Sequence, residues 1–247
     1  TGLDPDGDCA PSGVCDSLGI CVDGNHLWSK AFGDGSNQFV QWHTAVTVDD
    51  GGNVFMTGYY GGSADFGGGW LNAGQVADIF VAKLDPNGTH LWSKDFGDTS
   101  TQYGQGIAVD SSGNVFLVGS FWGTINFGGA DLVAAGSDVF VAKLGSGGTH
   151  LWSKRFGDPS NASGSAIGVD GSGNAVMTGS FAGTIQFGGP DLVAAGDSDI
   201  FVARLDASGN HLWSKRFGDS ATQAGGDVAV DAGGNVLLTG HFAGTIN

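Results

Sequence analysis

His26-Leu27-Trp28-Ser29-Lys30-Ala31-Phe32 is the first of four copies of one heptapeptide, and these copies decide the fold. The other copies begin at His90, His150 and His211, each copy is followed by Gly-Asp, and only the sixth position varies. The spacings between copies are 64, 60 and 61 residues, which indicates an internal repeat of one supersecondary unit. The chain is therefore built from repeats of about 60 residues.

An aspartate that stands four residues before an asparagine recurs with the same period. These residues are Asp49, Asp110, Asp170 and Asp231, at intervals of 61, 60 and 61. An Asp at such a place can accept hydrogen bonds from its own backbone, and the Gly and Asn that follow tolerate left-handed conformations. We expect a tight turn at this point of every repeat.

The third repeat contains four candidate strands, each rich in β-branched or aromatic residues and bounded by turn residues. No window has a helical period long enough to compete. Four short antiparallel strands repeated at about 60 residues are what a blade of a β-propeller requires. The sequence therefore predicts an all-β propeller of four-stranded blades. The four candidate strands are Ala166 to Val169, Ala175 to Phe181, Asp199 to Leu205 and His211 to Phe217.

Side-chain size fits a wedge-shaped blade. The first strand of each repeat has small residues such as Gly106 and Ala166, which suits the crowded axis, and later strands have bulkier ones such as Phe116 and Phe201. Strand alternation places the heptapeptide His, Trp, Lys and Phe on one face, so we expect the Trp and Phe to pack against the next blade. The repeated tryptophans could instead form a platform that stacks on sugars, and this alternative stays open.

Charge and motifs exclude several classes of function. Nine basic residues against 25 acidic ones give a net charge of −16, which disfavours binding to nucleic acid or to anionic membranes. No run of 18 apolar residues exists, so we expect no membrane insertion. Four of the six histidines occupy one repeat position on separate blades, and no nucleophile elbow, phosphate loop or zinc-protease helix appears. We expect no catalytic residues and no cofactor.

Residues 1–24 differ in composition from the repeats, which occupy residues 25–247. Cys9, Cys15 and Cys21 all lie in this segment and are candidates for a disulfide. One of the three must stay free, pair between chains or have lost a partner. The chain begins without a signal peptide or initiator Met, which is typical of a mature product. We expect an extracellular or cell-surface protein.

Asp4, Asp6 and Asp8 alternate in this segment, as at the start of a calcium-binding loop. Gly follows the second Asp and no Glu stands at the twelfth position of the loop, so the pattern is incomplete. A calcium ion held by these three residues is one interpretation, and a solvated acidic turn is the other.

The repeats resemble the bacterial SBBP-type β-propeller repeats, a family often called seven-bladed. The residues that carry the resemblance are GIAVDSSGNVFLVGSF at 106–121 and DVFVAKLGSGGTHLWSKRFGD at 138–158, with their copies. The GTINFGG and DLVAAG segments look like those of myxobacterial members. The resemblance implies a propeller in a secreted or surface-anchored bacterial protein, and it implies no catalytic residues because the family pattern is structural.

The two ends of the chain complement each other. The C-terminal part has two strands of a fourth blade, Asp227 to Val230 and Val236 to Phe242. Leu18 to Val22 and His26 to Phe32 could supply the third and fourth strands. Joining the ends would leave no open edge, so we expect four blades with the last shared between the termini. The rival interpretation is a larger ring completed by further chains or by a longer parent chain.

Loops between the repeats vary where the strands do not, and they are the candidate binding surface. Trp42 and His43 stand in one such loop, which differs from the equivalent Thr101-Gln102-Tyr103. We expect a non-enzymatic structural or protein-interaction module that self-associates through blade edges. A lectin is the first alternative, because Tyr59, Tyr60 and Trp122 are also expected to be exposed. A propeller enzyme with its site at the channel mouth is the second.

Overall fold

The computed structural model describes residues 13–15, 21–23, 28–32, 45–231 and 233–245. The chain forms two compact units, Thr1–Ala31 and Phe32–Asn247. In the first unit, β1 (Gly13–Cys15) and β2 (Cys21–Asp23) form an antiparallel hairpin. Cys21 and Val22 belong to this hairpin, and residues 28–32 form no strand. The predicted strands Leu18 to Val22 and His26 to Phe32 lie partly outside the described residues, and their described residues belong to no four-stranded sheet.

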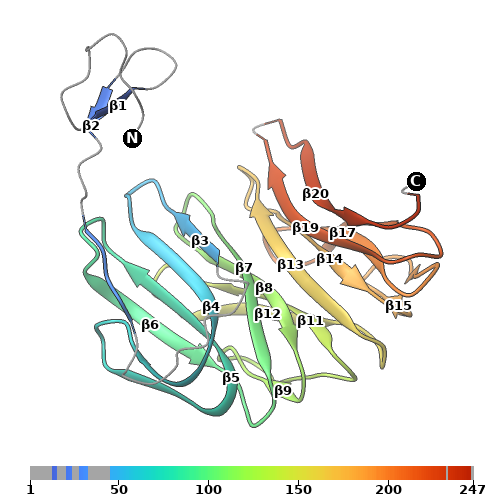
Figure 1. Ribbon diagram of the computed structural model, residues 1–247, viewed down its shortest axis with the longest axis horizontal. Coiled ribbons are helices and arrows are strands. Elements are labelled where there is room, and N and C mark those ends of the chain that lie inside the picture. The colour runs from blue at the N-terminus through green and yellow to red at the C-terminus, as the bar shows by residue number, and fades with distance from the viewer. Residues whose placement is uncertain (1–12, 16–20, 24–27, 33–44, 232, 246–247) are drawn as a thin grey trace. The chain divides into compact units, whose positions relative to one another are not determined.

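The described residues of the second unit form three four-stranded and three two-stranded antiparallel sheets (Figure 1). Sheet 1 is β3 (Ala45–Val48), β4 (Val54–Asp65), β5 (Trp70–Leu84) and β6 (His90–Phe96). Sheet 2 is β7 (Gln102–Val109), β8 (Val115–Phe121), β11 (Asp138–Leu144) and β12 (His150–Phe156). Sheet 3 is β13 (Ala162–Val169), β14 (Ala175–Phe181), β17 (Asp199–Leu205) and β18 (His211–Phe217). Sheet 4 is β19 (Gln223–Val230) and β20 (Val236–Phe242).

The four-stranded blades predicted from the repeat are thus present three times. The excursion between the second and third strands forms a short two-stranded sheet that the sequence did not predict. It is β9 (Thr124–Ile125) with β10 (Leu132–Val133) between β8 and β11, and β15 (Thr184–Ile185) with β16 (Leu192–Val193) between β14 and β17. The described residues form no closed ring of sheets, so the expected fourth blade is represented by β19 and β20 alone.

The first strands of successive sheets lie next to one another, as the small residues predicted. β3 contacts β7, β7 contacts β13, and β13 contacts β19 (Figure 1). A Cβ on Gly106 would come within 3.0 Å of the Cα of Ala166 and within 2.8 Å of a Val118 methyl group. A larger residue would push the two strands apart, so glycine is required by the close approach of the two backbones.

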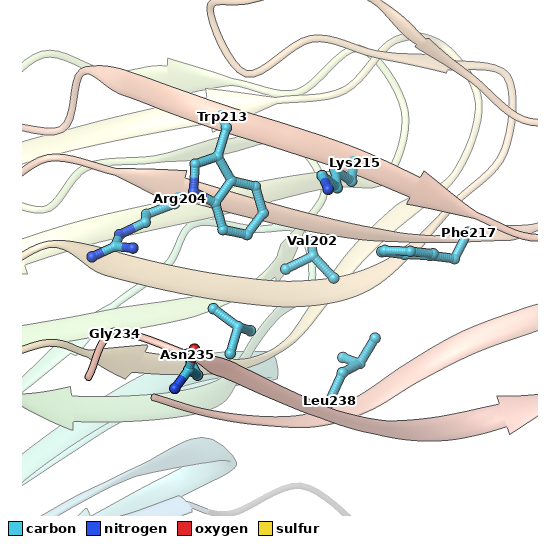
Figure 2. A pocket seen from close by; sticks show the side chains of 9 residues that line it. Val202, Arg204, Trp213, Lys215, Phe217, Gly234, Asn235 and Leu238 are labelled. Atoms are coloured by element: carbon cyan, nitrogen blue, oxygen red, sulfur yellow. The ribbon is translucent and has the colours of Figure 1, made fainter. Parts of the chain in front are cut away.

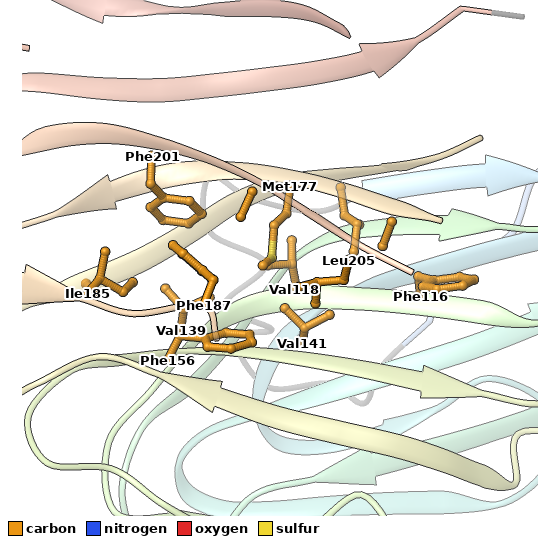
Figure 3. Close-up of a cluster of buried hydrophobic side chains, with 14 of the residues drawn as sticks. Phe116, Val118, Val139, Val141, Phe156, Met177, Ile185, Phe187, Phe201 and Leu205 are labelled. Atoms are coloured by element: carbon orange, nitrogen blue, oxygen red, sulfur yellow. The ribbon is translucent and has the colours of Figure 1, made fainter. Parts of the chain in front are cut away.

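Hydrophobic side chains fill the space between neighbouring sheets. Val139 and Val141 of sheet 2 meet Met177 and Phe201 of sheet 3 in one buried cluster (Figure 3). An equivalent cluster joins sheet 1 to sheet 2 around Phe140. Each sheet therefore obtains much of its apolar burial from the sheet beside it, and this burial is the main source of its stability.

The heptapeptide tryptophans also connect neighbouring sheets through a hydrogen bond. The Trp92 indole N–H donates to the carbonyl of Ser146 at 3.0 Å, and Trp152 donates to the carbonyl of Ala207 at 3.1 Å. Both acceptors lie in the turn between the third and fourth strands of the next sheet. The Trp152 ring packs on Gly209 of that turn, where a Cβ would approach it to 3.1 Å. The prediction that these tryptophans pack against the next blade is correct.

The heptapeptide histidines face the opposite way from the prediction. His90 pairs with Leu84 while Trp92 pairs with Lys83, so Leu91 is an extra residue in a β-bulge. A bulge reverses the alternation, and the His90 ring therefore lies on the same side as Ser93, whose hydroxyl is 3.0 Å from Nε2. The ring covers Gly68, where a Cβ would lie 2.1 Å from it, which is a structural role.

The recurring aspartates form the predicted turns, and Asp49, Asp110 and Asp170 also make an ion pair with a Lys or Arg side chain of the same sheet. Oδ1 of Asp170 accepts the backbone N–H groups of Ser172 and Asn174, and Oδ2 accepts from the side chains of Asn174 and Arg204. Burial alone would raise the pKa of Asp170, but these hydrogen bonds outweigh it and lower the pKa to about 2. The turn is thus stabilised by a charged carboxylate.

We predict that Asp170→Ala lowers the free energy of unfolding at pH 7 by about 2 kcal/mol, because Asn174 and Arg204 lose their acceptor. A carboxyl whose pKa is lowered on folding contributes above its unfolded value, so the contribution should fade between about pH 4 and pH 2. Urea unfolding at pH 7 and pH 2.5 measures both effects. Asp231→Ala is the matched control, since its turn is exposed and makes no ion pair among the described residues. Equal losses for the two variants at pH 7 would contradict the role of the buried ion pair.

Candidate functional site

The free edge of sheet 4 is the most distinctive surface of the second unit. β20 pairs with β19 on one side, and its other side has no partner strand among residues 45–231 and 233–245. The equivalent strands β4, β8 and β14 each pair with a third strand. A free edge with open backbone N–H and C=O groups is a template for an added strand.

Apolar side chains on β20 are exposed where the same repeat positions elsewhere are buried. Leu237 is 57% exposed, whereas Phe116 at the same position of sheet 2 is fully buried. Phe242 is 59% exposed, whereas Phe121 and Phe181 are at most 1% exposed. Both faces of the strand thus have hydrophobic groups that the other sheets bury.

A threonine hydroxyl on the second strand donates a hydrogen bond to the third strand in sheets 1 and 3. Thr57 donates to the carbonyl of Phe80 at 2.8 Å, and Thr178 donates to the carbonyl of Phe201 at 2.9 Å. Both acceptors belong to the third strand of the same sheet. Thr239 stands at this register position in β20 and is exposed.

A groove of about 490 Å³ lies between sheet 3 and sheet 4 (Figure 2). Trp213, Phe217 and Leu238 form its apolar part, and Arg204, Lys215 and Asn235 supply polar groups. Trp213 is equivalent to Trp92 and Trp152, but its indole N–H has no acceptor among the described residues because sheet 4 has no turn between a third and a fourth strand there. The groove thus lies where sheets 1 and 2, and sheets 2 and 3, pack against each other. It is open because sheet 4 has only two strands among the described residues.

A second surface, between sheets 1 and 2, contains three aromatic rings. Tyr59 and Tyr103 meet edge to face at 4.5 Å, and Tyr103 meets Trp122 in the same way at 5.9 Å. Ser100 and Thr101 line a hollow of about 440 Å³ beside Tyr103 and Trp122. Rings beside hydroxyl groups can stack on a ligand and donate hydrogen bonds to it.

The residues that were predicted to be exposed for binding differ in their observed exposure. Trp122 is 40% exposed, as expected, but Tyr60 is buried, because it occupies the position of the core residues Phe121 and Phe181. Gln102 of the expected binding loop is also fully buried, where its side chain donates to Asp98 and to the carbonyl of Trp122. Sequence reasoning missed Tyr103 as a neighbour of Trp122, since no pattern in one repeat indicates a contact between two sheets.

The remaining predicted residues lie mainly outside the described part of the chain. Cys15 and Cys21 are opposite each other in the β1–β2 hairpin, and the cysteine side chains lie outside the described part of the chain, so the disulfide stays a prediction. Other predicted residues outside the description are Asp4, Asp6, Asp8, Cys9, Trp42 and His43.

The described residues contain neither a candidate metal-binding group nor a candidate membrane-spanning helix. No group of three or more His, Cys, Asp or Glu side chains within them is arranged to hold a metal ion. The described part of the chain has no helix that is long and apolar enough to cross a membrane.

Comparison with known proteins agrees with the repeat architecture. Residues 91–125 match the family model described as SBBP, a β-propeller repeat. They run from the heptapeptide strand β6 into the first strands of sheet 2. An uncharacterized WD repeat-containing protein of Acanthamoeba polyphaga mimivirus is 23% identical over 82% of this chain, and the chain spans 19% of that relative's length. Residues 91–125 are therefore similar to a β-propeller repeat of the SBBP type, and the antiparallel sheets of the second unit agree with such a repeat.

Proposed function

We propose that the chain is a secreted or cell-surface, non-enzymatic interaction module whose binding site is the free edge of β20. The observation that carries the proposal is the exposure of Leu237 and Phe242 at positions that are buried in complete sheets. An added strand would pair with β20 and cover both side chains, as β11 does for β8. Hydrophobic contact supplies the affinity and strand pairing supplies the register.

The strand that fits this edge best is the first heptapeptide. Three copies form the fourth strands β6, β12 and β18, whereas residues 28–32 of the first copy form no strand. Sheet 4 has no third or fourth strand among the described residues, so one incomplete sheet and one heptapeptide copy outside the described strands occur in the same chain. A segment that includes residues 18–32 would also bring a turn whose carbonyl can accept from Trp213.

Donation within one molecule would give the four-bladed ring with its last blade shared between the termini. Donation to a second molecule would make self-association the function of the edge. We expect one of these two outcomes, and light scattering distinguishes them: a monomer with a protected β20 in hydrogen exchange indicates closure, and a dimer or polymer indicates assembly. A monomer whose β20 amides exchange freely would contradict the proposal.

Trp213→Phe should lower the free energy of unfolding by about 1 kcal/mol, because it deletes an indole hydrogen bond once sheet 4 is complete. Trp152→Phe is the matched control, since its hydrogen bond to Ala207 is present in the structure. Urea unfolding of both variants provides the comparison. A loss for Trp152→Phe with no loss for Trp213→Phe would show that no turn reaches Trp213.

Glycan binding is a second candidate function, supported by the exposed Trp122 beside Tyr103, Ser100 and Thr101. If this surface is a lectin site, Trp122→Ala should weaken a glycan detected on an array by about tenfold, because stacked aromatic rings provide much of the contact energy. Trp70→Ala, which removes another exposed aromatic ring, is the control. An array without any bound glycan would remove this candidate.

A further inference from the structure

A buried aspartate stands at the same register position of the third strand in each complete sheet, opposite Tyr60, Phe121 or Phe181: Asp78, Asp138 and Asp199. In sheets 2 and 3 it is neutralised by an arginine from the sixth heptapeptide position, Arg155 or Arg216, through Nη1 and Oδ2. The same Oδ2 atoms accept a backbone N–H at 2.9 Å. The arginine also donates to a backbone carbonyl, that of Gly157 at 3.4 Å or Gly218 at 3.1 Å.

Sheet 1 has the aspartate but not the arginine. Asp95 occupies the sixth heptapeptide position, so a second carboxylate stands where sheets 2 and 3 have a cation. Asp78 makes no ion pair among the described residues, unlike Asp138 and Asp199. The Oδ1 atom has no hydrogen-bond donor in any of the three aspartates. Asp78 is 7% exposed and the other two are fully buried, as expected when the covering arginine is absent.

A second change accompanies the first. Tyr60 stands where sheets 2 and 3 have Phe121 and Phe181, and its hydroxyl donates to Oδ2 of Asp95 at 3.4 Å. Burial and the charges of Asp95 and Asp98 raise the pKa of Asp78 to about 7. Sheet 1 thus has two carboxylates and a tyrosine hydroxyl where sheets 2 and 3 each have an ion pair.

We propose that this place binds a guanidinium group from outside, an arginine side chain of a partner peptide, in the position that Arg155 and Arg216 occupy in their sheets. Asp78 and the carbonyl of Gly97 correspond to the two acceptors used there, and Asp95 adds a third. The planar, multiply donating guanidinium suits two carboxylates and a carbonyl better than an ammonium does. The net charge of −16 would attract a basic peptide.

Guanidinium is favoured over a metal ion by the donor set. The described residues have no group of three or more carboxylate, His or Cys side chains suited to a metal. In sheets 2 and 3 the aspartate and the carbonyl at the equivalent positions bind the guanidinium of an arginine. This site is separate from the free edge of β20, so it goes beyond the proposed function and can fail independently of it.

The test is calorimetric titration of the full chain at pH 8 with acetyl-Gly-Arg-Gly-amide, with the matched Lys and Gln peptides for comparison. We expect the Arg peptide to bind, the Lys peptide to bind several-fold more weakly, and the Gln peptide not to bind. At pH 5.5 the Arg peptide should bind at least about tenfold more weakly, because Asp78 is then protonated.

Asp95→Arg is the decisive variant, because it places an arginine at the position in sheet 1 that is equivalent to Arg155 and Arg216. It should abolish binding of the Arg peptide and raise the thermal midpoint. Asp50→Arg changes the net charge equally in an exposed turn and should leave binding unchanged. Asp95→Ala, which removes one acceptor without filling the site, should weaken binding severalfold.

Two results would overturn the proposal. One is equal binding of the Arg peptide to the wild type and to Asp95→Arg. The other is no binding of the Arg peptide to the wild type at pH 8. A thermal midpoint that rises as the pH falls from 7 towards 4 is expected in either case, since a carboxyl with a raised pKa stabilises the fold when it is protonated.

Discussion

Contact between neighbouring sheets is the interaction on which the rest of the structure depends. A sheet in this fold buries its second and third strands only when the next sheet covers them, as Val139 and Met177 show. The indole hydrogen bonds of Trp92 and Trp152 fix how far the next sheet lies, because each requires the turn of that sheet to be present. Each complete sheet is therefore stabilised by a neighbouring sheet that follows it in the chain. The sheet that follows sheet 3 has only two strands, β19 and β20, among the described residues.

The repeat made most of the fold predictable. The period, the Asp turns and the small first-strand residues indicated four-stranded blades and their stacking, since each feature is local and occurs four times. The orientation of His90 was not predictable from alternation, because the bulge at Leu91 depends on pairing with β5. The short hairpins β9–β10 and β15–β16 were missed because two-residue strands have no sequence pattern of their own.

The candidate sites were less predictable for a related reason. They arise where one repeat differs from its copies or where two sheets meet. Tyr60 was expected to be exposed, but its repeat position belongs to the core. Its hydroxyl beside Asp95, and the absence of arginine beside Asp78, matter only in comparison with sheets 2 and 3. A repeat protein thus provides its own internal reference, and departures from it mark where function is to be sought.

Hydrogen exchange of the β20 amides, in the full chain and in a chain that lacks residues 1–32, measures whether the first heptapeptide completes sheet 4. We expect slow exchange at Val236–Phe242 in the full chain, because an added strand pairs with this edge. We expect much faster exchange after the deletion, with β8 and β14 unchanged as internal controls. Equally fast exchange of β20 in both chains would show that the heptapeptide of residues 26–32 does not complete sheet 4.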